Sequence, residues 1–224
     1  MKAIAINGSP RKQGNTATLL NKALAGAASL GAETEIVNLY DIDYKGCQSC
    51  YACKLKGGKS YGKCAQQDGL TPVLERIRKA DVLILGSPIY LAMISGEMKA
   101  FLERFMYPYV KYSISPPRSL FPGKPSIGFI YTMGQSEDGM RAMGYDWQIK
   151  ACQALLDWLA FEDMSGKTEF LVVNDTYMFD DYSKYDDTAH NVEAKEKRRR
   201  EVFPLDCDKA FEMGIRLAKL SINK

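Results

Sequence analysis

The sequence contains only one histidine, His190, among 224 residues. Because most acid–base and metal sites built on imidazole use several histidines, this scarcity excludes most such schemes and makes a nucleophilic hydrolase hard to build. The chain also lacks an apolar run of the roughly 20 residues that a membrane helix needs, so we expect no membrane partner. Its net charge is only +3 and its basic residues are interleaved with acids, so we expect no nucleic-acid partner.

The N-terminus lacks the apolar stretch and the small-residue cleavage site of a signal peptide. Met1 and Lys2 lead directly into a strand-like run, so we expect a cytoplasmic protein. The six cysteines should then be mostly reduced. Three of them form a tight cluster in the sequence, which indicates metal or redox chemistry before structural disulfides.

Short apolar runs alternate with helical patterns along the chain. The run Val-Leu-Ile-Leu at residues 82–85 does not alternate with polar residues, as expected for a parallel strand buried on both faces. Strands separated by helices need crossover connections, so the pattern predicts an α/β fold with a doubly wound, five-stranded parallel sheet and helices on both faces. The predicted strands are 2–7, 35–39, 81–86, 126–132 and 169–174, and the predicted helices are 16–27, 70–80, 96–106, 147–161 and 206–221.

The length suits one domain with extensions. We predict a single domain over residues 1–224, with a cysteine loop at 46–65 and insertions at 107–124 and 175–204. Ligands of doubly wound sheets bind at the carboxyl ends of the strands. Three polar or glycine-rich loops fall at these ends, at residues 8–15, 87–95 and 133–139.

The first of these loops, Gly8 to Thr16, joins a strand to a helix and is rich in anion-binding groups. The unpaired amides and the helix dipole at such a junction attract an anion, and polar side chains add hydrogen bonds to it. The loop lacks the lysine–serine pair of a Walker motif and the Gly-x-Gly-x-x-Gly fingerprint of dinucleotide sites. We predict a phosphate cradle, the alternative being an ordinary turn with a helix cap. Its residues are Ser9, Arg11, Lys12, Gln13, Gly14, Asn15 and Thr16.

Four motifs carry a resemblance to a known family. They are Gly8-Ser9-Pro10-Arg11, Gly14-Asn15-Thr16, Gly86-Ser87-Pro88-Ile89-Tyr90 and Gly96-Glu97-Met98-Lys99. Over about the first 135 residues the chain resembles the flavodoxin-like NADPH-dependent FMN reductase and iron-sulfur flavoprotein family. The resemblance implies bound FMN, with its phosphate in the first loop and its isoalloxazine ring along two others. The ring residues that it implies are Pro88, Ile89, Tyr90, Leu91, Ala92, Thr132, Met133 and Gly134.

Cys47, Cys50 and Cys53 follow one another at three-residue spacing, and Cys64 comes after ten further residues. Three thiolates at this spacing on an irregular loop can converge on one iron–sulfur cluster, with the fourth ligand supplied from further along. The resemblance implies a 4Fe-4S cluster in this place, although the gap before Cys64 is longer than in the compact version of the motif. The residues leave open a structural zinc, a thiol–disulfide pair and cysteines that only fill space.

The predicted function combines these two sites. We expect an FMN-dependent oxidoreductase of the iron-sulfur flavoprotein type, which moves electrons between an acceptor and a donor that is NAD(P)H or a redox protein such as ferredoxin. The alternatives are an NAD(P)H-dependent FMN or quinone reductase without a cluster, and a non-catalytic flavin-binding redox sensor. We assign no catalytic side chain, because hydride transfer to a flavin needs alignment rather than a protein base. The resemblance also implies a homodimer or homotetramer.

A basic run from Lys195 to Arg200 lies in the second insertion. It can bind an anion such as the phosphate of NADPH, or it can form a solvated helix face paired with nearby acids. We favour the solvated helix face, with Asp180, Asp181, Asp186 and Asp187 as its partners.

Overall fold

A parallel sheet lies at the centre of the computed structural model, which describes residues 1–112, 118–161 and 168–222. Five of its strands lie side by side, and each is parallel to its neighbours among the five. In spatial order they are β2 (Glu33–Asn38), β1 (Lys2–Asn7), β3 (Val82–Tyr90), β7 (Ser126–Thr132) and β8 (Glu169–Val173). This is the order 2-1-3-4-5 of flavodoxin-like sheets. The prediction of a doubly wound sheet with five parallel strands is confirmed.

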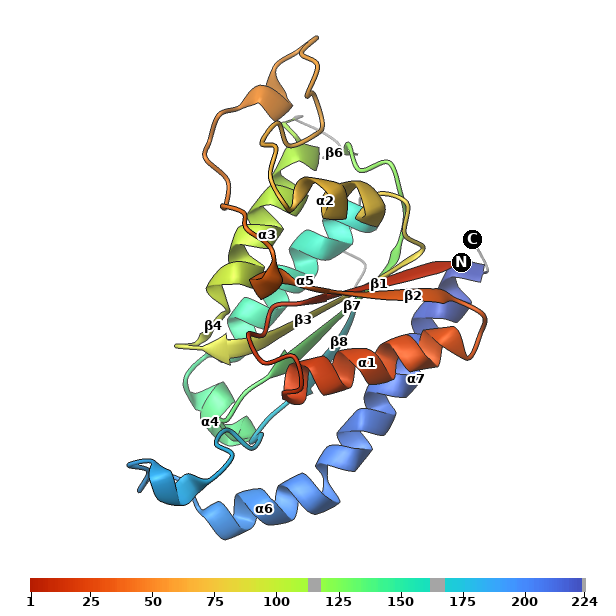
Figure 1. The fold of residues 1–224 in the computed structure, drawn as a ribbon. Helices are drawn as coiled ribbons and strands as arrows, with labels where there is room; N and C mark the ends of the chain where they lie inside the picture. The colour runs from red at the N-terminus through yellow and green to blue at the C-terminus, as the bar shows by residue number, and fades with distance from the viewer. Residues whose placement is uncertain (113–117, 162–167, 223–224) are drawn as a thin grey trace.

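Helices cover both faces of the sheet (Figure 1). One face carries α1 (Asn15–Ala28) and α7 (Phe203–Ile222), and the other carries α2 (Thr71–Ile77), α3 (Gly96–Met106) and α5 (Tyr145–Phe161). Side chains of β1 alternate between the two layers: Ala3 and Ala5 pack with α1 and α7, and Ile4 and Ile6 pack with α3. Because both faces are covered, the central strands β1, β3 and β7 are mostly apolar, and their polar residues lie near the strand ends.

α1 and α7 contact each other through one glycine on each helix. A Cβ atom added to Gly214 would lie 1.9 Å from the carbonyl oxygen of Ala23, and one added to Gly26 would lie 2.0 Å from the carbonyl oxygen of Phe211. Only glycine lets the two backbones approach this closely. The contact holds α1 in place and, with it, the loop that precedes α1.

The end of β3 differs from the sequence-based expectation. The strand continues to Tyr90 instead of ending at Gly86, because Ser87 and Pro88 stay extended beside β7 and the next residues pair with β4 (Met93–Ile94). β4 is antiparallel to β3 and forms the return of a tight loop. The residues that follow Gly86 are therefore held by the sheet rather than by a free turn.

The structure also contains α4 (Glu137–Ala142), which the sequence does not predict, and α6 (Val192–Glu201), of which the sequence indicates only the basic run as a helix face, without bounds. α6 is almost entirely polar, so it shows no apolar periodicity from which a helix could be predicted. Asn191 caps α6, since its side-chain oxygen accepts from the amide of Ala194 at 3.0 Å. α7 then begins at Phe203, three residues before the predicted start at Asp206.

The insertions and the cysteine loop extend from the sheet (Figure 1). The first insertion contains the turn Tyr107–Tyr109 and the antiparallel pair β5 (Val110–Lys111) and β6 (Arg118–Ser119), while its residues 113–117 lie outside the described part. The second contains the turn Tyr182–Lys184 and α6. A short turn at Leu39–Asp41 lies before the cysteine loop, and another at Ala52–Lys54 lies within it. Of the helices described, none is long and apolar enough to cross a membrane.

Candidate functional site

A cavity of about 860 Å³ opens at the carboxyl edge of the sheet, where the loops after β1, β3, β7 and β8 meet. This is the edge at which doubly wound sheets bind ligands. The structure brings every predicted cofactor residue except Leu91 and Ala92 to this cavity: Ser9, Arg11, Lys12, Gln13, Gly14, Asn15, Thr16, Pro88, Ile89, Tyr90, Thr132, Met133 and Gly134. It adds residues outside the predicted cofactor set: Thr176, Tyr177, Met178, Phe179, Asp180 and Arg199.

The loop between β1 and α1 is shaped by its own side chains. The side-chain oxygen of Asn7 accepts from the amide of Ser9 at 3.0 Å, and the hydroxyl of Ser9 accepts from the amide of Arg11 at 3.2 Å. α1 begins after Gly14, and in the described part of the chain no side chain caps its first turn. The amides of that turn are therefore available to an anion, and the positive end of the helix dipole favours one there.

Two hydroxyl contacts hold the three loops together around the cavity. The hydroxyls of Thr16 and Thr132, both buried, lie 2.7 Å apart and join the first loop to the third. The hydroxyl of Ser95 donates to the carbonyl of Gly8 at 2.6 Å and accepts from the amide of Met98 at 3.2 Å. Ser95 therefore caps α3 and fixes the second loop to the first.

Leu91 and Ala92 form the tip of the second loop. Their φ angles are 48° and 68°, in the left-handed region, where residues with a side chain carry strain. Such strain concentrates at functional sites. Both residues line an adjoining cavity of about 220 Å³, which shares Ile89, Met133 and Gly134 with the larger one. The predicted ring residues thus lie around two neighbouring cavities.

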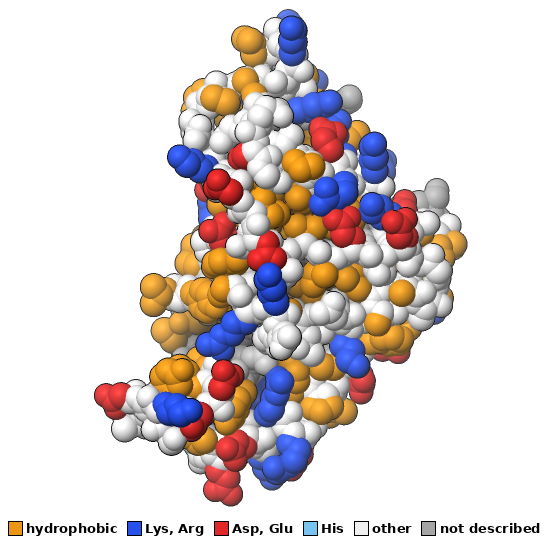
Figure 2. Space-filling model, viewed as in Figure 1, with side chains coloured by type: hydrophobic (Ala, Val, Ile, Leu, Met, Phe, Trp, Pro, Cys, Tyr) orange, Lys and Arg blue, Asp and Glu red, His pale blue; other side chains and the backbone are white. Residues whose placement is uncertain are grey.

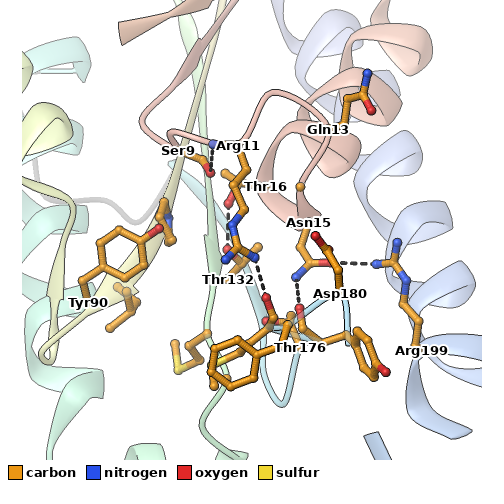
Figure 3. Close-up of a pocket in the computed structure, with 18 of the residues that line it drawn as sticks. Ser9, Arg11, Gln13, Asn15, Thr16, Tyr90, Thr132, Thr176, Asp180 and Arg199 are labelled. Atoms are coloured by element: carbon orange, nitrogen blue, oxygen red, sulfur yellow. Dashed lines mark hydrogen bonds between the residues drawn. The ribbon is translucent and has the colours of Figure 1, made fainter. Parts of the chain in front are cut away.

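The segment after β8 closes one side of the cradle. Arg11 donates to the carbonyl of Met178, and the amide of Asn15 donates to the carbonyl of Tyr177 at 2.9 Å. Figure 3 shows these two contacts together with a third, from Arg199 to Asn15. The signal that could have indicated this segment is its position, because the second insertion begins directly after a strand whose carboxyl end lies at the same edge of the sheet.

The basic run in α6 has partners other than those predicted. Lys195 is buried and pairs with Asp175 at 2.6 Å, and Arg198 pairs with Asp206 at 2.8 Å. The expected pairing with Asp180, Asp181, Asp186 and Asp187 is therefore wrong for Lys195 and Arg198. The carboxylates that pair with these two cations belong to the turn after β8 and to α7. Figure 2 shows basic and acidic side chains mixed over the face that includes α6.

The cysteine loop forms a second site, beside the C-terminal half of α3. All four predicted ligands, Cys47, Cys50, Cys53 and Cys64, are free thiols that line one small cavity of about 10 Å³. Burial raises the pKa of the Cys53 thiol; the Lys54 ammonium opposes this, and the three other sulfurs raise it further. The four sulfurs share one site because all four cysteines line the same cavity.

Arg104 of α3 is fully buried at the base of the cysteine loop. Its guanidinium donates to the sulfur of Cys64 at 2.8 Å, to the carbonyl of Lys45 at 2.8 Å, and to the two carboxylate oxygens of Asp68 at 2.7 and 3.2 Å. One side chain thus joins both ends of the loop to α3. Burial on its own would raise the pKa of the Asp68 carboxyl, but the hydrogen bonds and charge of Arg104 outweigh it and lower that pKa.

The donor set of this second site suits a thiolate-ligated cluster. Four thiols surround one cavity, and a buried guanidinium binds one of the sulfurs, which helps to balance the negative charge of thiolates. Across residues 1–112, 118–161 and 168–222, however, no three Cys, His, Asp or Glu side chains converge closely enough to hold a metal ion. The thiols share a site but would have to move closer together to ligate a common cluster.

The fold and the larger cavity define a flavodoxin-like protein with a cavity at the carboxyl edge of its sheet, lined by the residues predicted to form a phosphate cradle. Residues 1–149 match the family described as NADPH-dependent FMN reductase. Because the match covers more than half of the chain, the chain belongs to the NADPH-dependent FMN reductase family, which is a family of flavin-dependent oxidoreductases.

Curated relatives carry the name iron-sulfur flavoprotein. One from Methanocaldococcus jannaschii is 34% identical over 139 residues, which cover 62% of this chain and 65% of the relative. One from Archaeoglobus fulgidus is 40% identical over 104 residues, which cover 46% of this chain and 48% of the relative. One from Methanosarcina thermophila is 28% identical over 164 residues, which cover 73% of this chain and 75% of the relative. The matches thus span from about half to three quarters of the relatives' lengths.

Solved structures share the fold along nearly the whole chain. An NAD(P)H:quinone oxidoreductase from Methanothermobacter marburgensis has a TM-score of 0.68 at 14% identity, with 97% of this chain and 98% of that chain covered. An azoreductase from Bacillus anthracis has a TM-score of 0.67 at 13% identity, with 96% of this chain and 99% of that chain covered. At these identities the likeness shows the fold, and it confirms the flavodoxin-like class.

Proposed function

We propose that the chain binds FMN in the larger cavity and is an FMN-dependent oxidoreductase of the iron-sulfur flavoprotein type. The observation that carries this proposal is the cavity itself, which has the phosphate cradle of Ser9 to Thr16 at one end and Pro88, Ile89 and Tyr90 along another side. Membership in the NADPH-dependent FMN reductase family supports FMN as the ligand.

Each part of the cavity has a role in holding the cofactor. The first-turn amides of α1 and the hydroxyls of Ser9 and Thr16 would bind the phosphate. The backbone of residues 88–92 and the loop at Met133 would orient the ring and exclude water from its edge. Bound FMN supplies the hydride and single-electron chemistry, so the protein contributes position and electrostatics.

We propose that Cys47, Cys50, Cys53 and Cys64 hold a 4Fe-4S cluster, which supplies one-electron transfer. α3 connects the two sites, because Ser95 at its start binds the cradle and Arg104 near its end binds Cys64. These two residues are nine positions apart, which corresponds to roughly 14 Å along a helix axis. One rigid helix would therefore keep the cysteine site at a fixed distance from the flavin loops.

The electron donor in this proposal is NAD(P)H or a redox protein such as ferredoxin. The description of the family supports a nicotinamide donor, and the names of the relatives support the cluster. We further propose that residues 1–224 form a single domain and that the protein assembles as a homodimer or homotetramer.

Anaerobic purification tests both halves of the proposal. The protein is expected to contain bound FMN together with iron and acid-labile sulfide, at roughly four atoms of each per chain. Cys50→Ser is expected to lower the iron content and leave the FMN content unchanged, because the cysteine loop lies apart from the larger cavity. Cys152→Ala, on α5 outside the loop, is the control and should keep the iron. Protein without iron and sulfide would contradict the cluster, and protein that does not bind FMN would contradict the flavin.

The second candidate is an NAD(P)H-dependent FMN or quinone reductase without a cluster. It is favoured by the finding that no three potential ligands in the described part of the chain are close enough together to hold a metal ion. Rapid bleaching of the flavin by NADPH in iron-free protein would support this candidate, whereas bleaching that depends on iron would support the first. A non-catalytic redox sensor would instead bind FMN tightly and show no turnover with any donor or acceptor.

A further inference from the structure

A cation from the C-terminal part of the chain faces the phosphate end of the larger cavity. Arg199 lies in α6, beyond the residues that match the family, and its Nη1 donates to the side-chain oxygen of Asn15 at 2.6 Å. In Figure 3, Arg11 and Arg199 approach from opposite sides, and Asn15 lies between them. We propose that Arg199 binds the phosphate group of FMN together with the loop Gly8 to Thr16. This inference rests on the proposed function.

Arg199 differs from its neighbours in α6 in having no acidic partner within the described part of the chain. Three other basic residues of α6 have acidic partners, in the pairs Lys195–Asp175 at 2.6 Å, Arg198–Asp206 at 2.8 Å and Arg200–Glu201 at 3.2 Å. Among the described residues, by contrast, no carboxylate forms an ion pair with Arg199. Its contacts are a neutral amide oxygen and the ring of Phe203, 4.3 Å from the guanidinium carbon. An aromatic face orients a guanidinium without removing its charge.

The other cations of the cradle do not make Arg199 redundant. Lys12 forms an ion pair with Asp41 at 2.8 Å, so part of its charge is already compensated. Arg11 lines the cavity and donates to a backbone carbonyl, so that contact brings no negative charge to offset its own. Asp180 also lines the cavity and offsets one positive charge. A phosphate monoester with nearly two negative charges therefore needs both Arg11 and Arg199 for its neutralisation.

The geometry of α6 supports this assignment. Asn15 is the first residue of α1, whose open amides would face the phosphate, and Arg199 is bound directly to the Asn15 side chain. A guanidinium in that place can reach a phosphate with two parallel donors, a geometry that a lysine ammonium does not offer. The insertion would thus add an outer wall to the cradle and distinguish FMN from riboflavin, which has no phosphate.

Titration of flavin-free protein with FMN and with riboflavin tests the inference. Arg199→Gln keeps a side chain that can donate to Asn15 but removes the charge, and it is expected to weaken FMN binding by roughly ten- to a hundredfold, as for the loss of one hydrogen bond to a charged group. Riboflavin affinity should not change, because riboflavin lacks the phosphate. Arg200→Gln is the matched control on the next position of α6, and both affinities should stay as in the unchanged protein. Quenching of flavin fluorescence measures all of these dissociation constants.

Three outcomes would overturn the inference. Unchanged FMN affinity in Arg199→Gln would show that the phosphate does not contact Arg199. An equal loss for FMN and riboflavin would show that Arg199 only maintains the shape of the cavity. A raised KM for NADPH, with unchanged FMN affinity and unchanged KM for NADH, would assign Arg199 to the phosphate of the nicotinamide donor. If the unchanged protein binds no FMN, the proposed function fails and the inference fails with it.

Discussion

Replacement of Arg104 by methionine is expected to lower the free energy of unfolding by about 3–5 kcal/mol. Methionine has a similar length but no charge, so the carboxylate of Asp68, which is 20% exposed, loses its cation, and the carbonyl of Lys45 loses its donor. The loss is large because groups are left buried and unpaired, rather than because an ion pair is intrinsically strong. Urea unfolding followed by circular dichroism measures the change.

A surface ion pair provides the control for this prediction. Arg141 pairs with Glu137 one turn earlier in α4, and both side chains are more than half exposed. Arg141→Met is therefore expected to change the unfolding free energy by only about 0.3–0.5 kcal/mol. A loss below about 1 kcal/mol for Arg104→Met would contradict the buried role assigned to this side chain. The Arg104 variant should also retain less iron, since Cys64 loses the group that positions its sulfur.

Gly214→Ala is expected to destabilise the protein, although helix propensity predicts the opposite. In the interior of a helix, alanine is more favourable than glycine by about 1 kcal/mol. At this position, however, the added methyl group would lie 1.9 Å from the carbonyl oxygen of Ala23, so α1 and α7 must move apart. Overpacking of this kind costs about 1–3 kcal/mol, and we expect a net loss. Because α1 carries the cradle, FMN affinity should fall as well. Thermal unfolding and FMN titration measure the two effects.

Gly96→Ala is the control for the helix contact. Gly96 is the first residue of α3, and apart from its chain neighbours and the backbone of α3 no described atom lies within 4 Å of the position that its Cβ would occupy. The substitution should be neutral or slightly stabilising, by up to about 1 kcal/mol, since alanine restricts the unfolded chain. A stabilising Gly214→Ala would show that α1 and α7 are not in backbone contact at this point.

The sheet could be predicted because its strands are short apolar runs that differ clearly from the helices around them. Val82 to Leu85 has no polar residue, and β3 is indeed buried on both sides there. The continuation of β3 through Pro88 could not be predicted, because a Ser-Pro pair is typical of a turn. That part of the strand is fixed by its pairing with β7, which the local sequence does not reveal.

The two sites differ in how far the sequence indicates them. The cradle and the cysteine spacing are local patterns, so their residues could be named in advance. Arg104 and Arg199 act through contacts with distant segments, Asp68 and Asn15, that no local pattern contains. A weak signal existed for Arg104, which comes three residues after the buried Phe101 and thus lies on the core side of α3. Because the basic run was interpreted as a solvated helix face, Arg199 was not predicted to line the cavity.

A crystal structure of the protein grown with FMN tests the central claim most directly. We predict that the phosphate lies at the first turn of α1, within hydrogen-bond distance of Ser9 and Thr16, and that the isoalloxazine ring lies beside Ile89 and Tyr90. A flavin bound in the opposite direction, or outside the cavity at the carboxyl edge of the sheet, would contradict the account.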